Sequence, residues 1–173
     1  MKVLVTAFLP FNNSLNNYSM EVIKYIDNVT KEILDVVYDE CYNVLNNKYN
    51  LNSFDLIVAL GEARMRKELT LELQAKNISS CSLKDNLGIL KQNEVIYENG
   101  KEIIKTKVSL DNIKELITFS TDAGKFVCNN LYYHLLLNYP SKSVFIHIPN
   151  CNDDENKYVE YANIINKIIK KLL

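Results

Sequence analysis

Short apolar stretches alternate with helical patterns along this chain, and no other feature of the sequence constrains its fold as strongly. Four stretches have the length and composition of strands: residues 2–6 and 142–149, which are typical of buried strands, and residues 31–39 and 54–61. Helical patterns follow or separate them at residues 20–26, 40–50 and 126–139, and an amphipathic helix follows at 156–173. This order of elements predicts a parallel sheet covered by helices.

Three local patterns refine this prediction. Residues 69–77 alternate apolar and polar side chains, which predicts a half-exposed strand with Glu72 on its polar face. The pair Asn99-Gly100 stands between two alternating runs and predicts a β-hairpin. Ser19 is placed to cap the helix that follows it.

The composition bounds the class of protein. The chain has 173 residues, 47% of them hydrophobic and 24% charged, which is typical of one globular domain spanning residues 1–173. The formal net charge of −1 disfavours a broad phosphate-binding surface, so we expect no nucleic-acid partner. No apolar run approaches the ~20 residues of a membrane span. The apolar N-terminal stretch is similar to a short signal peptide, but it ends early at Pro10 and no small-residue cleavage site follows. This indicates a buried strand in a cytoplasmic protein.

Cys128 has a setting that the other cysteines lack. The chain also contains Cys41, Cys81 and Cys151, and no CxxC pair, so neither a zinc ribbon nor a redox pair is predicted. Cys128 falls at the start of the predicted helix, where unpaired N–H groups and the helix dipole stabilise a thiolate. The same N–H groups can receive an oxyanion. The alternative is a buried cysteine that packs as a small hydrophobic residue.

A cysteine nucleophile needs a base, which is usually histidine, and the chain has two. His134 follows Cys128 on the same predicted helix, about 240° around it and about 9 Å along it, too far to bond the thiol. His147 lies near the carboxyl end of a predicted strand, where ligand sites form in doubly wound sheets. The alternative for His147 is a core histidine bonded to a backbone carbonyl.

A third group should orient the base. Glu72, Asp85 and Asp122 compete for this role, and the pattern alone leaves it unassigned. A solvated strand carboxylate is the alternative for Glu72. Other motif classes are absent: the chain has no GxGxxG, P-loop, HExxH or GxSxG sequence, and its scattered histidines and cysteines predict no zinc site.

Six segments carry a resemblance to a known family. They are residues 2–11 (KVLVTAFLPF), 17–19 (NYS), 70–77 (TLELQAKN), 84–88 (KDNLG), 122–129 (DAGKFVCN) and 145–149 (FIHIP). They resemble, in this order, the V-T-G-F-x-P-F, N-P-S/T, S-x-E-x-x-A-x-N, P-D-N-x-G, A-G-x-Y/F-x-C-N and F-x-H-V/I-P motifs of pyroglutamyl peptidase I, also called pyrrolidone carboxyl peptidase. The resemblance runs nearly end to end.

The resemblance implies a cysteine exopeptidase that removes N-terminal pyroglutamyl residues from peptides through an acyl-enzyme. It places the catalytic residues of the family on Cys128 as nucleophile, His147 as general base and Glu72 as the group that orients the imidazole. It thereby selects Glu72 among the competing acids.

The resemblance also implies the setting of this chemistry. The family fold is a single-domain three-layer α/β/α sandwich with a mostly parallel twisted sheet, and members are often homodimers or homotetramers. The lactam ring would lie in an apolar pocket near the first loop, for which Phe8, Phe11 and Asn17 are the candidates. Neither a cofactor nor a metal is implied.

The chain departs from the family pattern at several places. Ala7 replaces a glycine, Asn12 and Asn13 replace a glycine pair, and Leu73 and Ser82 replace two arginines. Two other functions therefore stay open: the same thiol chemistry on another small acyl or amide substrate, and ligand binding without catalysis.

Overall fold

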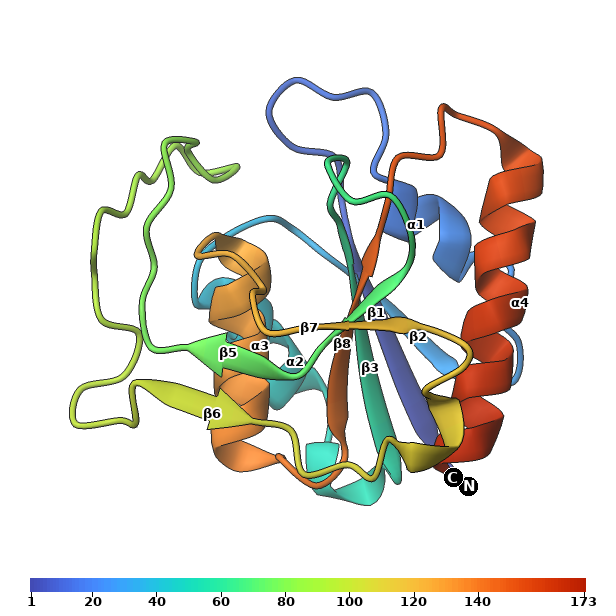
Figure 1. Ribbon diagram of the computed structural model, residues 1–173. Helices are drawn as coiled ribbons and strands as arrows, with labels where there is room; N and C mark the ends of the chain where they lie inside the picture. The colour runs from blue at the N-terminus through green and yellow to red at the C-terminus, as the bar shows by residue number, and fades with distance from the viewer.

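The computed structural model describes residues 1–173 and contains a six-stranded sheet in the order β2-β1-β3-β8-β4-β7 (Figure 1). Its strands are β1 (Val3–Phe8), β2 (Thr30–Leu34), β3 (Leu56–Glu62), β4 (Thr70–Glu72), β7 (Thr118–Ser120) and β8 (Ser143–Ile148). The helices are α1 (Tyr18–Ile23), α2 (Glu40–Lys48), α3 (Val127–Asn138) and α4 (Glu155–Leu172), with short 3-10 helices at Leu51–Ser53 and Asp111–Ile113. A separate antiparallel pair joins β5 (Gln74–Lys76) to β6 (Ile103–Lys105).

Four strands of the main sheet run in one direction. β1 pairs in parallel with β2 and β3, and β3 pairs in parallel with β8. β4 is antiparallel to β8 and parallel to β7, so two reversed strands complete one side of the sheet. The predicted mostly parallel sheet is confirmed, and β1 and β8 are buried at every residue, as their continuous apolar sequences require.

Helices cover both faces of the sheet. In Figure 1, α1 and α4 lie on one side and α2 and α3 on the other. A hydrophobic core lies on each face of the sheet, and alternate strand residues pack into one or the other. Val58 and Ile146 pack on the α1–α4 side, and Ile57 and Phe145 pack on the α2–α3 side. The expected three-layer α/β/α sandwich is therefore confirmed.

Residues 69–77 differ from the predicted half-exposed strand. They form two short strands, because β4 joins the main sheet whereas β5 turns away to pair with β6. Thr70, Leu71 and Glu72 are all buried. The expected exposed polar face was wrong, since β4 lies between two neighbouring strands of a sheet that is covered on both sides.

Two further predictions were wrong. No hairpin forms at Asn99-Gly100: β6 pairs with the distant β5, and Asn99 (φ 60°) lies in a turn in which the Gly100 N–H donates to the Tyr97 carbonyl over 3.1 Å. Helix α1 is capped by Asn17 instead of Ser19, because the Asn17 side chain accepts the Ser19 N–H.

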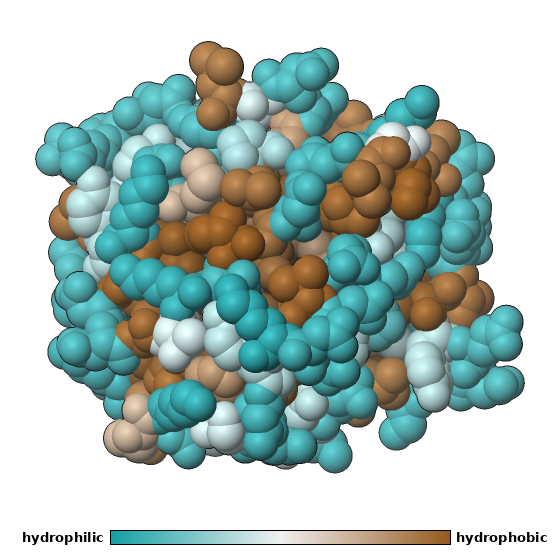
Figure 2. All heavy atoms as spheres, turned by 180° about the vertical axis from the view of Figure 1, so that it is seen from behind, coloured by the Kyte–Doolittle hydropathy of each residue, from teal (hydrophilic) through white to brown (hydrophobic).

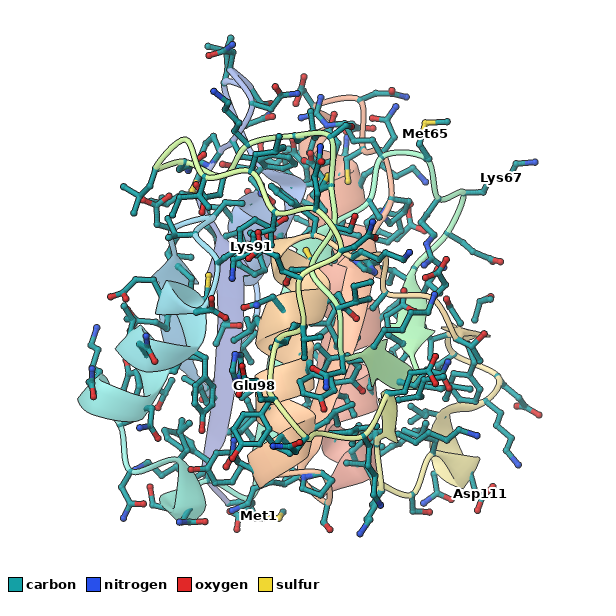
Figure 3. All side chains as sticks on the ribbon, turned by 90° about the vertical axis from the view of Figure 1, so that its left-hand side faces the viewer. Met1, Met65, Lys67, Lys91, Glu98 and Asp111 are labelled. Atoms are coloured by element: carbon teal, nitrogen blue, oxygen red, sulfur yellow. The ribbon has the colours of Figure 1, made fainter.

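Residues 77–102 form a long segment that passes over α3 (Figure 3). Asp85 fixes it, because its carboxylate accepts N–H groups from the segment itself and the N–H of Tyr38 before α2. Lys91, labelled in Figure 3, reaches Asp39 at the start of α2 with an Nζ–Oδ2 distance of 2.7 Å. The segment is thus attached to the α2–α3 side of the molecule.

The surface of the molecule is mixed. Seen from behind, Figure 2 shows hydrophobic atoms gathered near the middle of the face, with hydrophilic side chains around them. None of the helices combines the length and the apolar character that crossing a membrane requires.

Candidate active site

Three elements bring Cys128, His147 and Glu72 into one region of the molecule. Cys128 is the second residue of α3, whose N-cap is Phe126, so it lies in the first helical turn as expected. His147 is the next-to-last residue of β8 and is 4% exposed. Glu72 ends β4 and is fully buried.

The sheet register places Glu72 and His147 on the same face. Thr70 is the direct partner of His147 in the antiparallel β4–β8 pair, and Phe145 is the direct partner of Glu72. Residues two apart on a strand share a face, so Glu72 is the diagonal neighbour of His147 across the pair. Phe145 packs on the α2–α3 side, and this face is therefore the one that α3 covers.

A short hydrogen bond joins the two side chains. His147 Nδ1 lies 2.7 Å from Glu72 Oε1. A carboxylate only accepts, so Nδ1 carries the proton and Nε2 keeps its lone pair. His147 Nε2 makes no hydrogen bond within the protein, and this tautomer leaves it able to accept a proton.

The start of α3 offers free hydrogen-bond donors beside the thiol. The N–H groups of Val127, Cys128 and Asn129 donate to no other residue of the protein, as is usual for the first turn of a helix. They carry partial positive charge. A negatively charged oxygen near Cys128 would therefore find donors already in place.

The thiol itself is less acidic than its position in the helix suggests. Removal from water is the largest cause that raises the pKa of Cys128, and Cys41, Glu72 and Glu62 act in the same direction. Burial and two nearby carboxylates therefore oppose the effect of the helix start on this thiol in the free protein. The thiol needs a base to become a nucleophile.

A small cavity lies beside these residues. It has a volume of about 120 Å³, and Cys128 and His147 both line it. Aromatic and aliphatic side chains form most of the remaining wall, including Phe8, Phe11 and Phe126. The rings of Phe11 and Phe126 lie 5.7 Å apart between centroids, so the wall is continuous from the first loop to the start of α3.

The three residues expected to bind substrate all line this cavity, but their side chains differ in exposure and in the hydrogen bonds they already make. Phe8 is buried at the end of β1, and Phe11 is partly exposed in the first loop. The Asn17 side chain makes three hydrogen bonds within the protein. Its Oδ1 accepts from the N–H and the hydroxyl of Ser19, and its Nδ2 donates to the Leu9 carbonyl over 3.1 Å.

Two arginines in the loop between β3 and β4 contact acids of this region, and sequence reasoning identified neither. Arg66 Nη2 lies 2.7 Å from Glu72 Oε1. Arg64 Nε lies 2.7 Å from Oε1 of Glu62, a cavity-lining residue whose side chain is only 4% exposed. The only signal in the sequence was an arginine pair directly after an apolar strand, and that pattern is also typical of a solvated loop.

The remaining candidates lie elsewhere. His134 contacts Asp39 over 3.3 Å and stacks on Tyr42, so it takes no part in this site. Asp85 holds the 77–102 segment, and the Asp122 side chain is paired with Lys76 over 2.9 Å. No group of three or more His, Cys, Asp and Glu side chains is arranged to hold a metal ion.

Known proteins are similar to this chain in both sequence and fold. A family model for pyroglutamyl peptidase matches residues 1–161. The pyrrolidone-carboxylate peptidase of Thermosipho africanus is 32% identical over 167 residues, which cover 86% of this chain and 82% of that protein. The crystal structure of pyroglutamyl peptidase I from Bacillus amyloliquefaciens has a TM-score of 0.82 and 26% identity, covering 99% of this chain and 92% of that one. The pyrrolidone carboxyl peptidase of Fervidobacterium islandicum has a TM-score of 0.82 and 27% identity, covering 98% and 95%.

These matches extend over almost all of the elements described above, including those that bear Glu72, Cys128 and His147. A family model that spans most of the chain and a relative above 30% identity agree with each other and with the fold. The chain belongs to the pyroglutamyl peptidase family of cysteine peptidases.

Proposed function

We propose that this protein removes N-terminal pyroglutamyl residues from peptides, with Cys128 as nucleophile, His147 as general base and Glu72 as the group that orients the imidazole. The observation that carries the proposal is the 2.7 Å Glu72–His147 hydrogen bond beside a small cavity that Cys128 also lines. The names of the relatives, pyrrolidone-carboxylate peptidases, support the substrate.

The first chemical step follows from the protonation states. His147 Nε2 takes the proton of the Cys128 thiol as Sγ bonds to the carbonyl carbon that joins pyroglutamate to the next residue. The C–N bond then breaks, and His147 returns a proton to the leaving amine. Glu72 holds the imidazole in the tautomer that this transfer requires.

The tetrahedral intermediate places negative charge on the former carbonyl oxygen. The N–H groups of Val127 and Cys128 are suited to bind this oxyanion, because they donate to no other residue of the protein. Water then attacks the thioester, with His147 as base, and releases pyroglutamate and the free thiol.

The cavity suits a small neutral ring. Its volume of about 120 Å³ excludes long side chains, and the aromatic wall of Phe8, Phe11 and Phe126 matches an apolar ring face. Asn17 keeps one amide hydrogen beyond its bond to Leu9, and this hydrogen would donate to the lactam carbonyl.

The family resemblance also supports a proposal about the oligomeric state and the cellular compartment of the protein. We expect a homodimer or homotetramer in the cytoplasm, where reducing conditions keep Cys128 as a free thiol. Light scattering of the purified protein on a sizing column measures the assembly, and a monomeric mass would contradict it.

The decisive test is release of a fluorescent amine from a pyroglutamyl amide in the presence of a reductant. Wild type should turn over, and Cys128→Ala and His147→Ala should each lose at least about 10³-fold in kcat. Cys81→Ser is the matched control, because Cys81 lies outside the cavity and should keep wild-type activity.

A folded wild type that releases no amine would contradict the proposal. Other small acyl amides, tested in parallel, would then identify the same thiol chemistry on a different substrate. Failure of all of them would favour a ligand-binding relative without catalysis.

A further inference from the structure

We propose that Arg66 is a positioning residue of this active site, whose guanidinium holds the buried Glu72 carboxylate and ties it to the loop before Cys128. The inference rests on the proposed function, because it assigns a residue that acts through Glu72 on His147. Arg66 is not placed in contact with the substrate.

The contacts of Arg66 join two parts of the site. Its Nη2 donates to Glu72 Oε1 and to the backbone carbonyl of Asp122, both over 2.7 Å. Asp122 is followed by Ala123 and Gly124, which line the cavity. A single guanidinium nitrogen therefore connects the acid of the site to the loop that forms part of the cavity wall.

Glu72 depends on this contact for its charge. Its Oε1 accepts from both Arg66 and His147, and its buried Oε2 has no partner in the protein. Arg66 is the only arginine or lysine that pairs with it. A fully buried carboxylate without a cation is strongly disfavoured, so the Arg66 guanidinium offsets the cost of burying Glu72 where it accepts from Nδ1.

The loop between β3 and β4 presents Arg66 inward while its neighbours face solvent. Met65 and Lys67 are exposed and point away from the molecule in Figure 3, whereas the Arg66 side chain is only 28% exposed. The Arg66 N–H donates to the Ala63 carbonyl over 2.9 Å, which closes a turn and sets this direction.

Loss of the cation should change how the site binds protons. The titratable groups beside the Glu72–His147 pair are Cys128 and Tyr132 from α3 and Glu62 from β3. The Asp122 side chain pairs with Lys76, and Asp122 meets the site only through its backbone carbonyl, which accepts from Arg66. None of these supplies a cation in contact with Glu72. Removal of Arg66 leaves the buried pair without a cation, and we expect the acid limb of the activity profile to move to higher pH.

The test compares Arg66→Ala with Arg66→Lys and with Lys76→Ala. Lys76 is the matched control, since its side chain pairs with Asp122 in the same loop but does not touch Glu72. For Arg66→Ala we expect kcat/KM for the pyroglutamyl amide to fall about 10- to 100-fold at neutral pH, as for loss of a hydrogen bond to a charged group. Arg66→Lys should keep part of the activity, and Lys76→Ala most of it.

Two readouts separate positioning from a merely structural role. The acid limb of kcat/KM should shift upward in Arg66→Ala only, and millimolar guanidinium should restore part of its activity, because the vacated site is partly open to solvent. Thermal melting shows whether each variant is folded. If Arg66→Ala does not fold, Arg66→Gln carries the same comparison with a side chain of similar length.

The proposal is overturned if Arg66→Ala keeps activity within about twofold of wild type, if Lys76→Ala loses as much, or if activity falls with neither a shifted limb nor guanidinium rescue. The pH profile of iodoacetamide alkylation at Cys128 gives the same test without a substrate. Should wild type fail to cleave the pyroglutamyl amide, an upward shift of this alkylation profile in Arg66→Ala still supports the role of Arg66, and an unchanged profile overturns it.

Discussion

Gly61 lies directly against Cys128, and the missing side chain of this glycine lets the nucleophile approach the sheet. A β-carbon built on Gly61 would stand 2.9 Å from Cys128 Sγ and 2.8 Å from Phe145 Cζ. Gly61 is also the direct partner of His147 in the parallel β3–β8 pair. The same residue therefore borders both the proposed nucleophile and the strand position of the proposed base.

A Gly61→Ala substitution should impair the site more than the fold. The new methyl group must displace the thiol or the Phe145 ring, and overpacking of this kind costs roughly 1–3 kcal/mol of stability. We expect kcat for the pyroglutamyl amide to fall by at least about tenfold, because the thiol moves relative to its base. Chemical denaturation and kinetics on the same preparation measure both effects, and wild-type activity would contradict the expected contact.

Three strands of the parallel half of the sheet were predictable from local sequence, whereas β2 is a partly exposed edge strand that ends at Leu34, so the strand predicted over residues 31–39 was wrong in its extent. β1, β3 and β8 are continuous apolar runs, and a strand buried on both faces requires such a sequence. Helix α3 and its early cysteine followed from the same local reasoning. The start of a helix has unpaired N–H groups wherever the helix packs.

The reversed strands were not predictable, because their direction is set by distant partners. β4 is three residues long, and its place between β8 and β7 depends on pairing with residues that lie far along the chain. The burial of Glu72 follows from this pairing. Its alternating neighbours instead suggested a solvent-facing strand.

The contacts of Arg66 were hidden for a similar reason. Arg66 stands in a polar loop, where arginine is usually solvated, and only the closed fold brings Glu72 within 2.7 Å of it. The causes that raise the pKa of Cys128 were hidden as well, because the helix dipole can be inferred from local sequence, whereas burial and the charge of Glu62 cannot.

Glu72→Gln should preserve the shape of the site and remove its charge. The amide can present its NH2 group to Nδ1, which favours the tautomer with the proton on Nε2, and this tautomer cannot accept the thiol proton. We expect kcat to fall about 10²- to 10⁴-fold. Steady-state kinetics measure the loss. Glu68→Gln is the control, because Glu68 is exposed in the same stretch of chain, and equal losses in both variants would contradict the role of Glu72.

Alkylation of Cys128 should be slow at neutral pH in the free protein. Burial raises the pKa of this thiol, so the reactive thiolate is scarce and its fraction rises as the pH increases. The rate of iodoacetamide labelling at the Cys128 peptide, followed by mass spectrometry against a small free thiol, should be lower than that of the free thiol at neutral pH. A rate that is already at its plateau there would instead indicate a preformed thiolate–imidazolium pair.

Phe11→Ala should weaken substrate binding more than chemistry. Phe11 lines the cavity and contacts Phe126, but it lies on the first loop and not on the elements that carry Glu72 or His147. Loss of the ring should raise KM by about tenfold, the effect of roughly 1.4 kcal/mol of lost apolar contact, with a smaller change in kcat. Leu15→Ala on the same loop is the control, since Leu15 is fully exposed. A fall in kcat with KM unchanged would contradict this role.

Asp39 should stabilise the protein in a pH-dependent way. Its hydrogen bond to His134 is the largest cause that lowers its pKa, and Lys91 and Asn130 act in the same direction. A carboxyl group whose pKa is lowered by folding contributes stability above its unfolded value of about 3.9, and this contribution is lost as the pH falls through that value toward the folded one. Asp39→Asn should therefore lower the Tm at neutral pH and lose most of this effect under acid conditions.

The expected difference at neutral pH is modest, because the Asp39 side chain is 42% exposed and solvent screens its partners. We expect a fall of roughly 2–4 °C in Tm, as for about 1 kcal/mol in a domain of this size. Asp111→Asn is the matched control: Asp111 also pairs with a lysine, but it is 78% exposed and joins no other element of the fold. Thermal melts of both variants across the acid range would contradict the assignment if the deficit of Asp39→Asn stayed constant with pH, because the lost contribution would then not come from the ionised carboxylate.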